Sequence, residues 1–203
     1  MSDNNILQDL NPAQRDAVIH RHGPMLVVAG AGSGKTRVLT HRIAHLIEND
    51  NINPFQILAI TFTNKAAQEM KDRVAALVGP VAEKMWVSTF HSACVRILRR
   101  DAEQLGYPST FSIYDQADAV RLTGYVARDL GLDTKKFVPR SVHSHISNLK
   151  NELVSTQQAL DKAEGVFDRK IAEIYEEYQR RLRNSGAMDF DDLLFKMNVL
   201  LRD

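Results

Sequence analysis

The sequence contains a single cysteine, Cys94, and no long uninterrupted run of apolar residues. One cysteine cannot form an internal disulfide, which fits a reducing, cytoplasmic setting. No apolar run approaches the ~20 residues that a membrane-spanning helix needs. The first residues lack the basic start and apolar core of a signal peptide. The sequence therefore predicts a cytoplasmic protein with no membrane contact.

A strong charge imbalance is also missing, because 26 lysines and arginines face 25 aspartates and glutamates and leave a net charge of +1. Any nucleic-acid-binding surface must then be a local one. With 203 residues, 44% of them hydrophobic, the chain is long enough for one globular domain with a smaller insertion.

Short apolar runs alternate with helical periodicity in the first half of the chain. Three runs are typical of buried strands: Met25–Ala29, Ile57–Phe62 and Met85–Thr89. Each is followed by a predicted helix, over residues 35–49, 64–78 and 90–105. This alternation predicts an α/β fold with a parallel sheet and flanking helices.

The pattern changes after Gly106, and residues 112–185 show almost only helical periodicity. Helices are expected over residues 115–130, 140–151, 156–163 and 166–184. We therefore expect residues 1–110 and 187–203 to form a partial core domain, and residues 111–186 a helical insertion. A capped helix should begin near Asp189, and the chain is expected to stop within it, at a cut rather than at a natural end.

The stretch LVVAGAGSGKTR, residues 26–37, fits the phosphate-binding P-loop pattern between a predicted strand and a predicted helix. Backbone amides of residues 31–36 can bind phosphate oxygens, Lys35 can reach the β- and γ-phosphates, and the Thr36 hydroxyl can ligate Mg2+. The first position is Ala29, where the strict pattern has glycine. The plain alternative is a glycine-rich turn with an exposed lysine. The expected phosphate-binding residues are Ala29, Gly30, Ala31, Gly32, Ser33, Gly34, Lys35 and Thr36.

Three further segments go beyond a general P-loop protein: LNPAQR at 10–15, TFTNKAAQEM at 61–70 and VSTFHS at 87–92. Together with the P-loop, they make the chain resemble superfamily 1 DNA helicases of the UvrD/Rep/PcrA type over its entire length. The resemblance implies a RecA-like ATP-binding core and an inserted accessory subdomain. It also implies ATP and Mg2+ as cofactors, 3′–5′ movement along DNA and a role in DNA repair.

The first of these segments is similar to the adenine-reading Q motif of the family. The Gln14 amide carries a donor and an acceptor, which suits adenine. Gln14 also stands three residues after Asn11, so it can instead complete a helix capping box. The resemblance favours adenine contact for Gln14 and places Arg37 near the nucleotide.

The segment at 61–70 is similar to motif Ia of the family, which grips single-stranded DNA. It follows a predicted strand, and ligands bind at the carboxyl ends of parallel strands. The resemblance favours DNA contact for Thr63 and Asn64, and Lys65 supplies positive charge. Phe62 can either stack on a base or belong to the core. The alternative makes Asn64 a helix cap.

The segment at 87–92 is similar to motif Ib, so Thr89 and His91 are expected to donate to DNA phosphate. His91 could instead be structural, and no histidine, cysteine or carboxylate cluster has zinc spacing. The family's inserted subdomain contacts duplex DNA at a single-strand/double-strand junction. The resemblance makes four residues candidates for that contact: His143, His145, Asn148 and Lys150.

The family's acidic Asp-Glu pair, which holds Mg2+, does not occur anywhere in this sequence. The segment around Glu176 and Glu177 lies in an amphipathic helical pattern and is not that pair. The acids of Asp189–Asp192 fit capping roles. The resemblance also implies a second motor domain, which is not present in this sequence. The chain alone should therefore bind nucleotide weakly and neither hydrolyse ATP nor unwind DNA. Two alternatives stay open: a truncated non-enzymatic nucleotide- or DNA-binding paralogue, and a P-loop nucleotide kinase.

Overall fold

The computed structural model describes residues 4–202. The chain forms two compact units, residues 1–90 and 91–203, and each is described by itself. None of the helices in the described range has the length and apolar character needed to cross a membrane.

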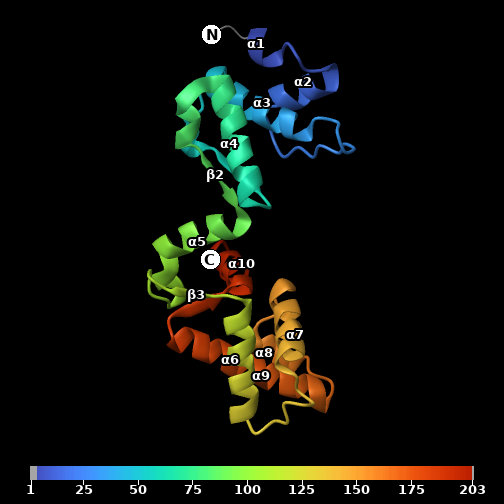
Figure 1. Ribbon diagram of the computed structural model, residues 1–203, viewed down its shortest axis with the longest axis vertical. Coiled ribbons are helices and arrows are strands. Elements are labelled where there is room, and N and C mark those ends of the chain that lie inside the picture. Colours follow the sequence, from blue (N-terminus) through green and yellow to red (C-terminus); the bar gives the residue numbers. More distant parts are fainter. Residues whose placement is uncertain (1–3, 203) are drawn as a thin grey trace. The chain divides into compact units, whose positions relative to one another are not determined.

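The first unit packs helices against a small parallel sheet (Figure 1). Its α-helices are α1 (Asn4–Leu7), α2 (Pro12–Ile19), α3 (Lys35–Glu48) and α4 (Asn64–Val78), with 3-10 helices η1 (Pro54–Gln56) and η2 (Gly79–Lys84). The strands are β1 (Leu58–Thr61) and β2 (Trp86–Thr89). The helices predicted at 35–49 and 64–78 and the second and third predicted strands are confirmed.

Strands β1 and β2 pair in parallel, with Leu58 opposite Trp86 and Thr61 opposite Thr89. The two strands therefore end level with each other. Their inward side chains meet α3 and α4 in one core cluster, made of Ile43, Ile57, Ala59, Ala67, Met70, Val74, Ala82, Met85 and Val87.

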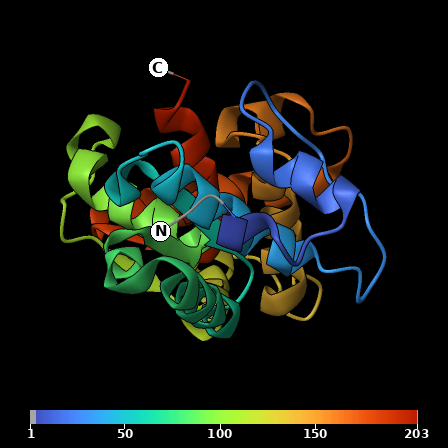
Figure 2. The same cartoon turned by 90° about the horizontal axis from the view of Figure 1, so that it is seen from above.

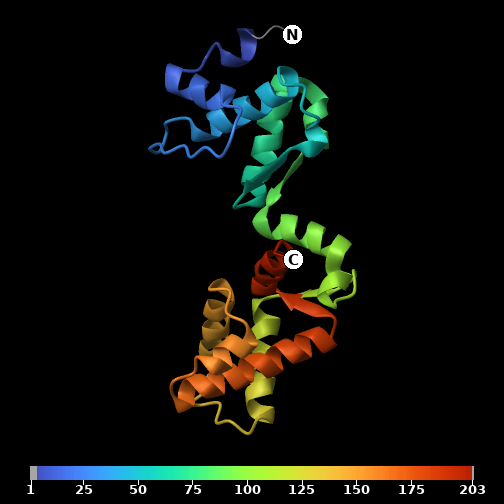
Figure 3. The ribbon, with the colours of Figure 1, turned by 180° about the vertical axis from the view of Figure 1, so that it is seen from behind.

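The predicted first strand, Met25–Ala29, is wrong for this structure. Figures 1, 2 and 3 draw this segment as a loop, and its Leu26 and Val28 side chains are 87% and 86% exposed. A strand needs neighbours for its backbone N–H and C=O groups, and the sheets of the described chain contain only β1 with β2 and β3 with β4. We expected a partial RecA-like core with the P-loop segment in its parallel sheet, but in the described residues that segment pairs with neither β1 nor β2, so a RecA-like sheet is not confirmed.

The second unit is mostly helical. It comprises α5 (Phe90–Asp101, beginning at the last residue of the first unit), η3 (Ala102–Leu105), β3 (Ser112–Tyr114), α6 (Gln116–Asp129), α7 (Pro139–Asn151), α8 (Thr156–Asp161), α9 (Val166–Asn184), β4 (Ala187–Asp189) and α10 (Phe190–Leu200). The predicted helices of this half are confirmed within a few residues. Helix α10 ends at Leu200, so the expectation of a chain that stops within a helix is wrong.

Strands β3 and β4 were not predicted. They pair in parallel, with Ser112 opposite Ala187 and Tyr114 opposite Asp189, and β4 leads directly into α10 (Figure 3). Three residues are too few to show the alternation that reveals a strand in sequence. This pairing joins the two ends of the segment that we expected to be an insertion.

Helix α9 presents the apolar face that its sequence predicts. The residues Ile171, Ile174, Tyr175, Tyr178 and Leu182 are buried. Glu176 is exposed, and Glu177 accepts hydrogen bonds from Arg180 and Arg181. These hydrogen bonds, with that of Arg180 the strongest influence, lower the pKa of Glu177 to about 2. The interpretation of this segment as an amphipathic helix rather than an acidic catalytic motif is confirmed.

A buried lysine connects three elements of the second unit. The Lys150 Nζ atom of α7 lies 2.8 Å from Asp189 Oδ2 and 3.0 Å from Asp192 Oδ1. The Tyr178 hydroxyl donates to Asp189 at 2.7 Å, and the Gln179 amide donates to Asp192 at 3.1 Å. Asp189 and Asp192 also form the capping box of α10, which confirms their predicted capping role.

The charges in this cluster compensate one another only in part. Burial disfavours the Lys150 ammonium, but the two carboxylates outweigh that effect and raise its pKa. Burial also acts on Asp189, yet Lys150 holds the pKa of Asp189 below its usual value. Burial is the largest influence on Asp192 and raises its pKa, and the nearby charge of Asp189 acts in the same direction against Lys150. The positive end of the α10 dipole stabilises both acids.

We predict that Lys150→Met destabilises the second unit by about 3–5 kcal/mol, because it leaves buried carboxylates without a counter-charge. Lys162→Met is the matched control, since Lys162 is exposed and forms no ion pair in the described part of the chain. Its expected effect is within about 0.5 kcal/mol. Hydrogen exchange at the amides of α9 measures the stability of the second unit separately from that of the first. Equal protection of these amides in Lys150→Met and Lys162→Met would contradict the stabilising role of Lys150.

Candidate functional site

The glycine-rich loop before α3 turns sharply at two of its glycines. Gly32 has φ +76° and Gly34 has φ +87°, both in the left-handed region that favours glycine. The Ser33 hydroxyl donates to the Gly30 carbonyl at 2.6 Å and tightens the turn. Helix α3 begins at Lys35, and no side chain caps its start. Its positive N-terminal end therefore faces the loop, which suits an anion.

The side chain of Lys35 lies over the loop. Its ammonium donates to the carbonyl oxygens of Ala29 and Gly30, each at 2.8 Å. These are the acceptor contacts that phosphate oxygens can replace, since an ammonium has three rotatable donors. The lysine side chain therefore points back over the loop that precedes α3.

Gln14 takes part in two arrangements at once. The Gln14 Oε1 atom accepts a hydrogen bond from the backbone N–H of Asn11 at 3.0 Å. The Asn11 side-chain oxygen accepts one from the backbone N–H of Gln14 at 2.9 Å. This confirms the capping-box alternative. The Gln14 Nε2 atom also donates to the Ser33 carbonyl at 3.1 Å. An amide nitrogen and oxygen each keep one further hydrogen-bonding position, so adenine contact stays a prediction for Gln14.

Gly34 is favoured by its left-handed conformation, and the Gln14 side chain lies close to it. A Cβ atom at Gly34 would lie 2.9 Å from Gln14 Nε2. A side chain at position 34 would therefore displace the end of the Gln14 side chain from its present contact with the loop.

The residues that follow Lys35 lie at the exposed start of α3. Thr36 is the second residue of the helix. The Arg37 guanidinium lies 3.4 Å from the Asp9 carboxylate, in an exposed ion pair. The predicted roles of Thr36 toward Mg2+ and of Arg37 toward nucleotide stay predictions.

Sequence reasoning missed Arg42, which holds α2 against α3. Its guanidinium donates to the Ala17 carbonyl at 3.0 Å and also to the carbonyls of Val18 and His20, all at the end of α2. A cation at a helix C-terminus is stabilised by the helix dipole. Because α2 carries Gln14, Arg42 helps to fix where Gln14 lies. Nothing in the sequence pattern of α3 distinguishes Arg42 from a solvated arginine.

Two exposed aromatic rings lie just beyond the level ends of β1 and β2. Phe62 is 91% exposed and Phe90 is 46% exposed, with ring centroids 5.8 Å apart. The core alternative for Phe62 is therefore wrong. Phe90 was missed, although its position directly after a strand matches that of Phe62 and could have indicated it. An exposed aromatic pair at the ends of two strands is a suitable surface for stacking a base.

Beside this pair, α4 begins with polar residues. The Thr63 hydroxyl accepts from the Ala66 amide at 3.1 Å, so Thr63 is the helix cap and the alternative of Asn64 as the cap is wrong. Asn64 and Lys65 occupy the exposed first turn of the helix. The N-terminus of α4 thus offers positive partial charge beside the aromatic pair.

The remaining motif residues lie on either side of the boundary between the units. Thr89 ends β2 and is half-buried. His91 is exposed near the start of α5, and its ring meets that of Phe190 edge-on, with centroids 5.8 Å apart. No group of three potential metal ligands occurs among the residues that the structure describes. Cys94 is buried, and burial raises the pKa of its thiol, which fits a core residue.

Two of the four duplex-DNA candidates are excluded by burial. His143 and Lys150 are each only 2% exposed, so neither can contact DNA from this fold. Burial lowers the pKa of His143, which favours its neutral form. His145 and Asn148 are exposed and border a cavity of the second unit.

The comparisons with known proteins agree with this arrangement. Residues 10–203 match the family described as the UvrD/REP helicase N-terminal domain. The chain is 56% identical over 201 residues to ATP-dependent DNA helicase UvrD1 of Mycobacterium tuberculosis, which covers 97% of this chain and 26% of that protein. It is 50% identical over 191 residues to ATP-dependent DNA helicase PcrA of Bacillus subtilis, covering 94% of this chain and 26% of that protein.

The chain thus spans about a quarter of the length of the curated relatives that it matches. The match includes the glycine-rich loop, both strand ends and the helical second unit. The chain belongs to the UvrD/REP helicase N-terminal domain family.

Proposed function

We propose that this chain is the ATP-binding and single-stranded-DNA-binding segment of a 3′–5′ ATP-dependent DNA helicase. The observation that carries the proposal is the first unit itself, where a phosphate loop with Lys35 directed into it precedes two level strand ends that expose Phe62 and Phe90. The relatives are named ATP-dependent DNA helicases, which supports the same activity for the full-length protein.

For the nucleotide, the loop offers groups that fit a triphosphate with Mg2+. The amides of residues 31–36 and the α3 N-terminus bind phosphate oxygens, and Lys35 exchanges its carbonyl contacts for the β- and γ-phosphates. The Thr36 hydroxyl is the Mg2+ ligand of this segment. Gln14, held against the loop through Ser33, recognises adenine, and Arg37 lies near the nucleotide. Bound Mg2+ neutralises charge on the β- and γ-phosphates.

For the DNA, Phe62 and Phe90 stack on a base, while Thr63, Asn64 and Lys65 at the start of α4 contact the backbone. Thr89 at the end of β2 adds to this surface, and His91 is a further phosphate donor. Stacking tolerates any base, which suits an enzyme that moves along DNA of any sequence. His145 and Asn148 remain the accessible candidates for contact at a single-strand/double-strand junction.

We further propose that residues 1–110 and 187–203 belong to the ATP-binding core and that residues 111–186 form an accessory subdomain. The rest of the helicase polypeptide then supplies the acidic Mg2+ and water-activating pair, the second motor domain, and strands that cover Leu26 and Val28. Those exposed apolar side chains support this division, because a P-loop strand is normally buried in a parallel sheet.

The first prediction of this proposed function concerns Lys35. Replacing Lys35 with Ala should weaken the binding of a fluorescent ATP analogue with Mg2+ about 10- to 150-fold, the usual range for a charge-assisted hydrogen bond. Lys65→Ala removes the same charge from α4 and should leave nucleotide affinity unchanged. Equal affinities of the wild-type and Lys35→Ala chains, measured by fluorescence anisotropy, would rule out the P-loop assignment.

The second prediction concerns the aromatic pair. Phe62→Ala should weaken binding of a single-stranded oligonucleotide by about 5- to 150-fold through lost stacking, with an unchanged dependence on salt. Phe55→Ala is the matched control, because Phe55 is 69% exposed but lies in η1. Lys65→Ala should instead reduce the salt dependence by about one counterion. A DNA surface elsewhere would make the two phenylalanine variants behave alike.

The third prediction concerns turnover. The chain by itself should release no phosphate from ATP above background, with or without single-stranded DNA, because the sequence contains no Asp-Glu pair. An arginine finger in a nucleotide hydrolase is worth about 10^3–10^5 in rate, and the second motor domain would carry it. DNA-stimulated phosphate release by the purified chain would contradict the proposal.

A further inference from the structure

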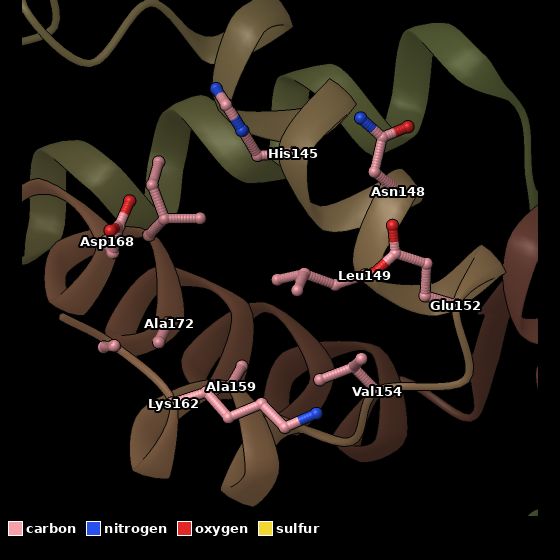
Figure 4. A pocket seen from close by; sticks show the side chains of 11 residues that line it. His145, Asn148, Leu149, Glu152, Val154, Ala159, Lys162, Asp168 and Ala172 are labelled. Carbon is pink, nitrogen blue, oxygen red and sulfur yellow. The ribbon is translucent and has the colours of Figure 1, made fainter.

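The second unit contains a cavity of about 280 Å³, formed by the end of α7, by α8 and by the first half of α9 (Figure 4). Its apolar lining comes from Leu149, Val154, Ala159, Ile171 and Ala172. Polar side chains surround this apolar base: His145, Asn148, Glu152, Lys162 and Asp168. A long side chain with an apolar stem and a polar end would match this arrangement of an apolar base and a polar rim.

The two acids of the cavity have no counter-charge of their own. Glu152 and Asp168 are exposed, and neither forms an ion pair among the residues that the structure describes. Other acids of α9 behave differently, since Glu173 pairs with Lys170 at 2.6 Å and Glu177 pairs with Arg180 at 2.6 Å. The cavity thus presents two carboxylates against the single ammonium of Lys162.

Helix geometry strengthens the negative potential at one side. Glu152 is the C-cap residue of α7, where the partial negative charge of the helix end adds to that of the carboxylate. Figure 4 shows Glu152 and Asp168 on opposite sides of the cavity, with Leu149 between them. A cation that enters over the apolar base meets a carboxylate on either side.

A partly exposed aromatic cluster adjoins the same cavity. Phe137 and Phe167 stack with centroids 5.3 Å apart, and His145, which lines the cavity, meets Phe167 edge-on at 5.9 Å. Val166 beside them is 82% exposed and Phe167 is 45% exposed. A chain that inserts one side chain into the cavity can therefore place its neighbouring apolar residues on this cluster.

We propose that the cavity is a docking site for an arginine side chain of a partner polypeptide. Its volume lies just below the ~300–1,000 Å³ typical of sites for drug-sized ligands, which favours one long side chain over a cofactor. Arginine combines an aliphatic stem with a planar guanidinium that binds carboxylates in a bidentate manner. It is also enriched at the energetic centres of protein interfaces. The two carboxylates disfavour a phosphate backbone inside the cavity, so this site is separate from the proposed nucleotide and single-stranded-DNA surfaces and shares only His145 and Asn148 with the proposed junction contact.

The test uses three capped tripeptides, Leu-Arg-Leu, Leu-norleucine-Leu and Leu-Glu-Leu, titrated into the isotope-labelled 203-residue chain. The arginine peptide should produce saturable NMR shifts at the amides of Asn148, Glu152, Ala159 and Ala172. The norleucine peptide keeps the apolar stem and should bind at least several-fold more weakly. The glutamate peptide should produce no saturable shift.

Substitutions distinguish the contribution of the two carboxylates to peptide affinity from that of the cavity shape. The double variant Glu152→Gln/Asp168→Asn should reduce the affinity for the arginine peptide to that for the norleucine peptide. Glu164→Gln/Glu176→Gln changes the net charge equally at exposed acids outside the cavity lining and should have no effect. Ala163→Leu, at a half-buried lining position, should weaken both peptides by filling the cavity. Hydrogen exchange at α9 verifies folding in each case.

Three results would overturn the proposal. The first is equal binding of the arginine and glutamate peptides. The second is an arginine affinity that the double variant leaves unchanged. The third is a single-stranded or duplex oligonucleotide that shifts these cavity amides while the arginine peptide does not, which would assign the surface to nucleic acid.

Discussion

The in-register parallel pairing of β1 with β2 determines where the functional residues of the first unit lie. Because Thr61 lies opposite Thr89, both strands end at the same level. Phe62 and Phe90 follow directly, so their rings come within 5.8 Å, and α4 begins beside them with Thr63 as its cap. A shift of one residue in this register would reverse the face of one strand. It would separate the aromatic pair and expose Ala59 or Val87, which are now buried in the core.

The second unit depends on a different constraint, the buried Lys150. Its ammonium connects α7 to the capping box that starts α10, and Tyr178 and Gln179 of α9 complete the hydrogen bonds. Buried charges persist only when they are paired and hydrogen-bonded. The same contacts bring α7 and α9 together, and the cavity with Glu152 and Asp168 lies between these helices and α8.

Much of the fold could be predicted from the sequence because its signals are local. Periodicity predicted α3, α4 and the helices of the second unit, and Asn11 and Asp189 cap helices as their sequence context predicted. The cap of α4 is Thr63 rather than Asn64, one residue before the predicted position. The strand at Met25–Ala29 could not be judged locally. Its apolar run is ordinary, but a strand exists only with partners, and the described sheets offer it none. The short β3 and β4 are visible only through their pairing with each other.

Prediction of the candidate site from the sequence has the same limit, because only local features could be predicted. The spacing of the glycines, Lys35 and Gln14 in the sequence identifies them as candidates. The hydrogen bonds of Gln14 to Ser33 and of Arg42 to the end of α2 are visible only in the three-dimensional structure. Lys150 and His143 look like solvated residues in a helical sequence, yet both are buried. Burial of a charged residue depends on distant partners, here Asp189 and Asp192, and no local pattern reports it.

One measurement tests the central claim most directly: NMR mapping of the labelled chain with Mg-ATP and, separately, with a single-stranded oligonucleotide. The account predicts that Mg-ATP shifts the amides of residues 30–37 and of Gln14. The oligonucleotide should instead shift residues 61–65 and 89–91. Shifts by both ligands at one common surface, or DNA shifts confined to residues away from the ends of β1 and β2, would contradict it.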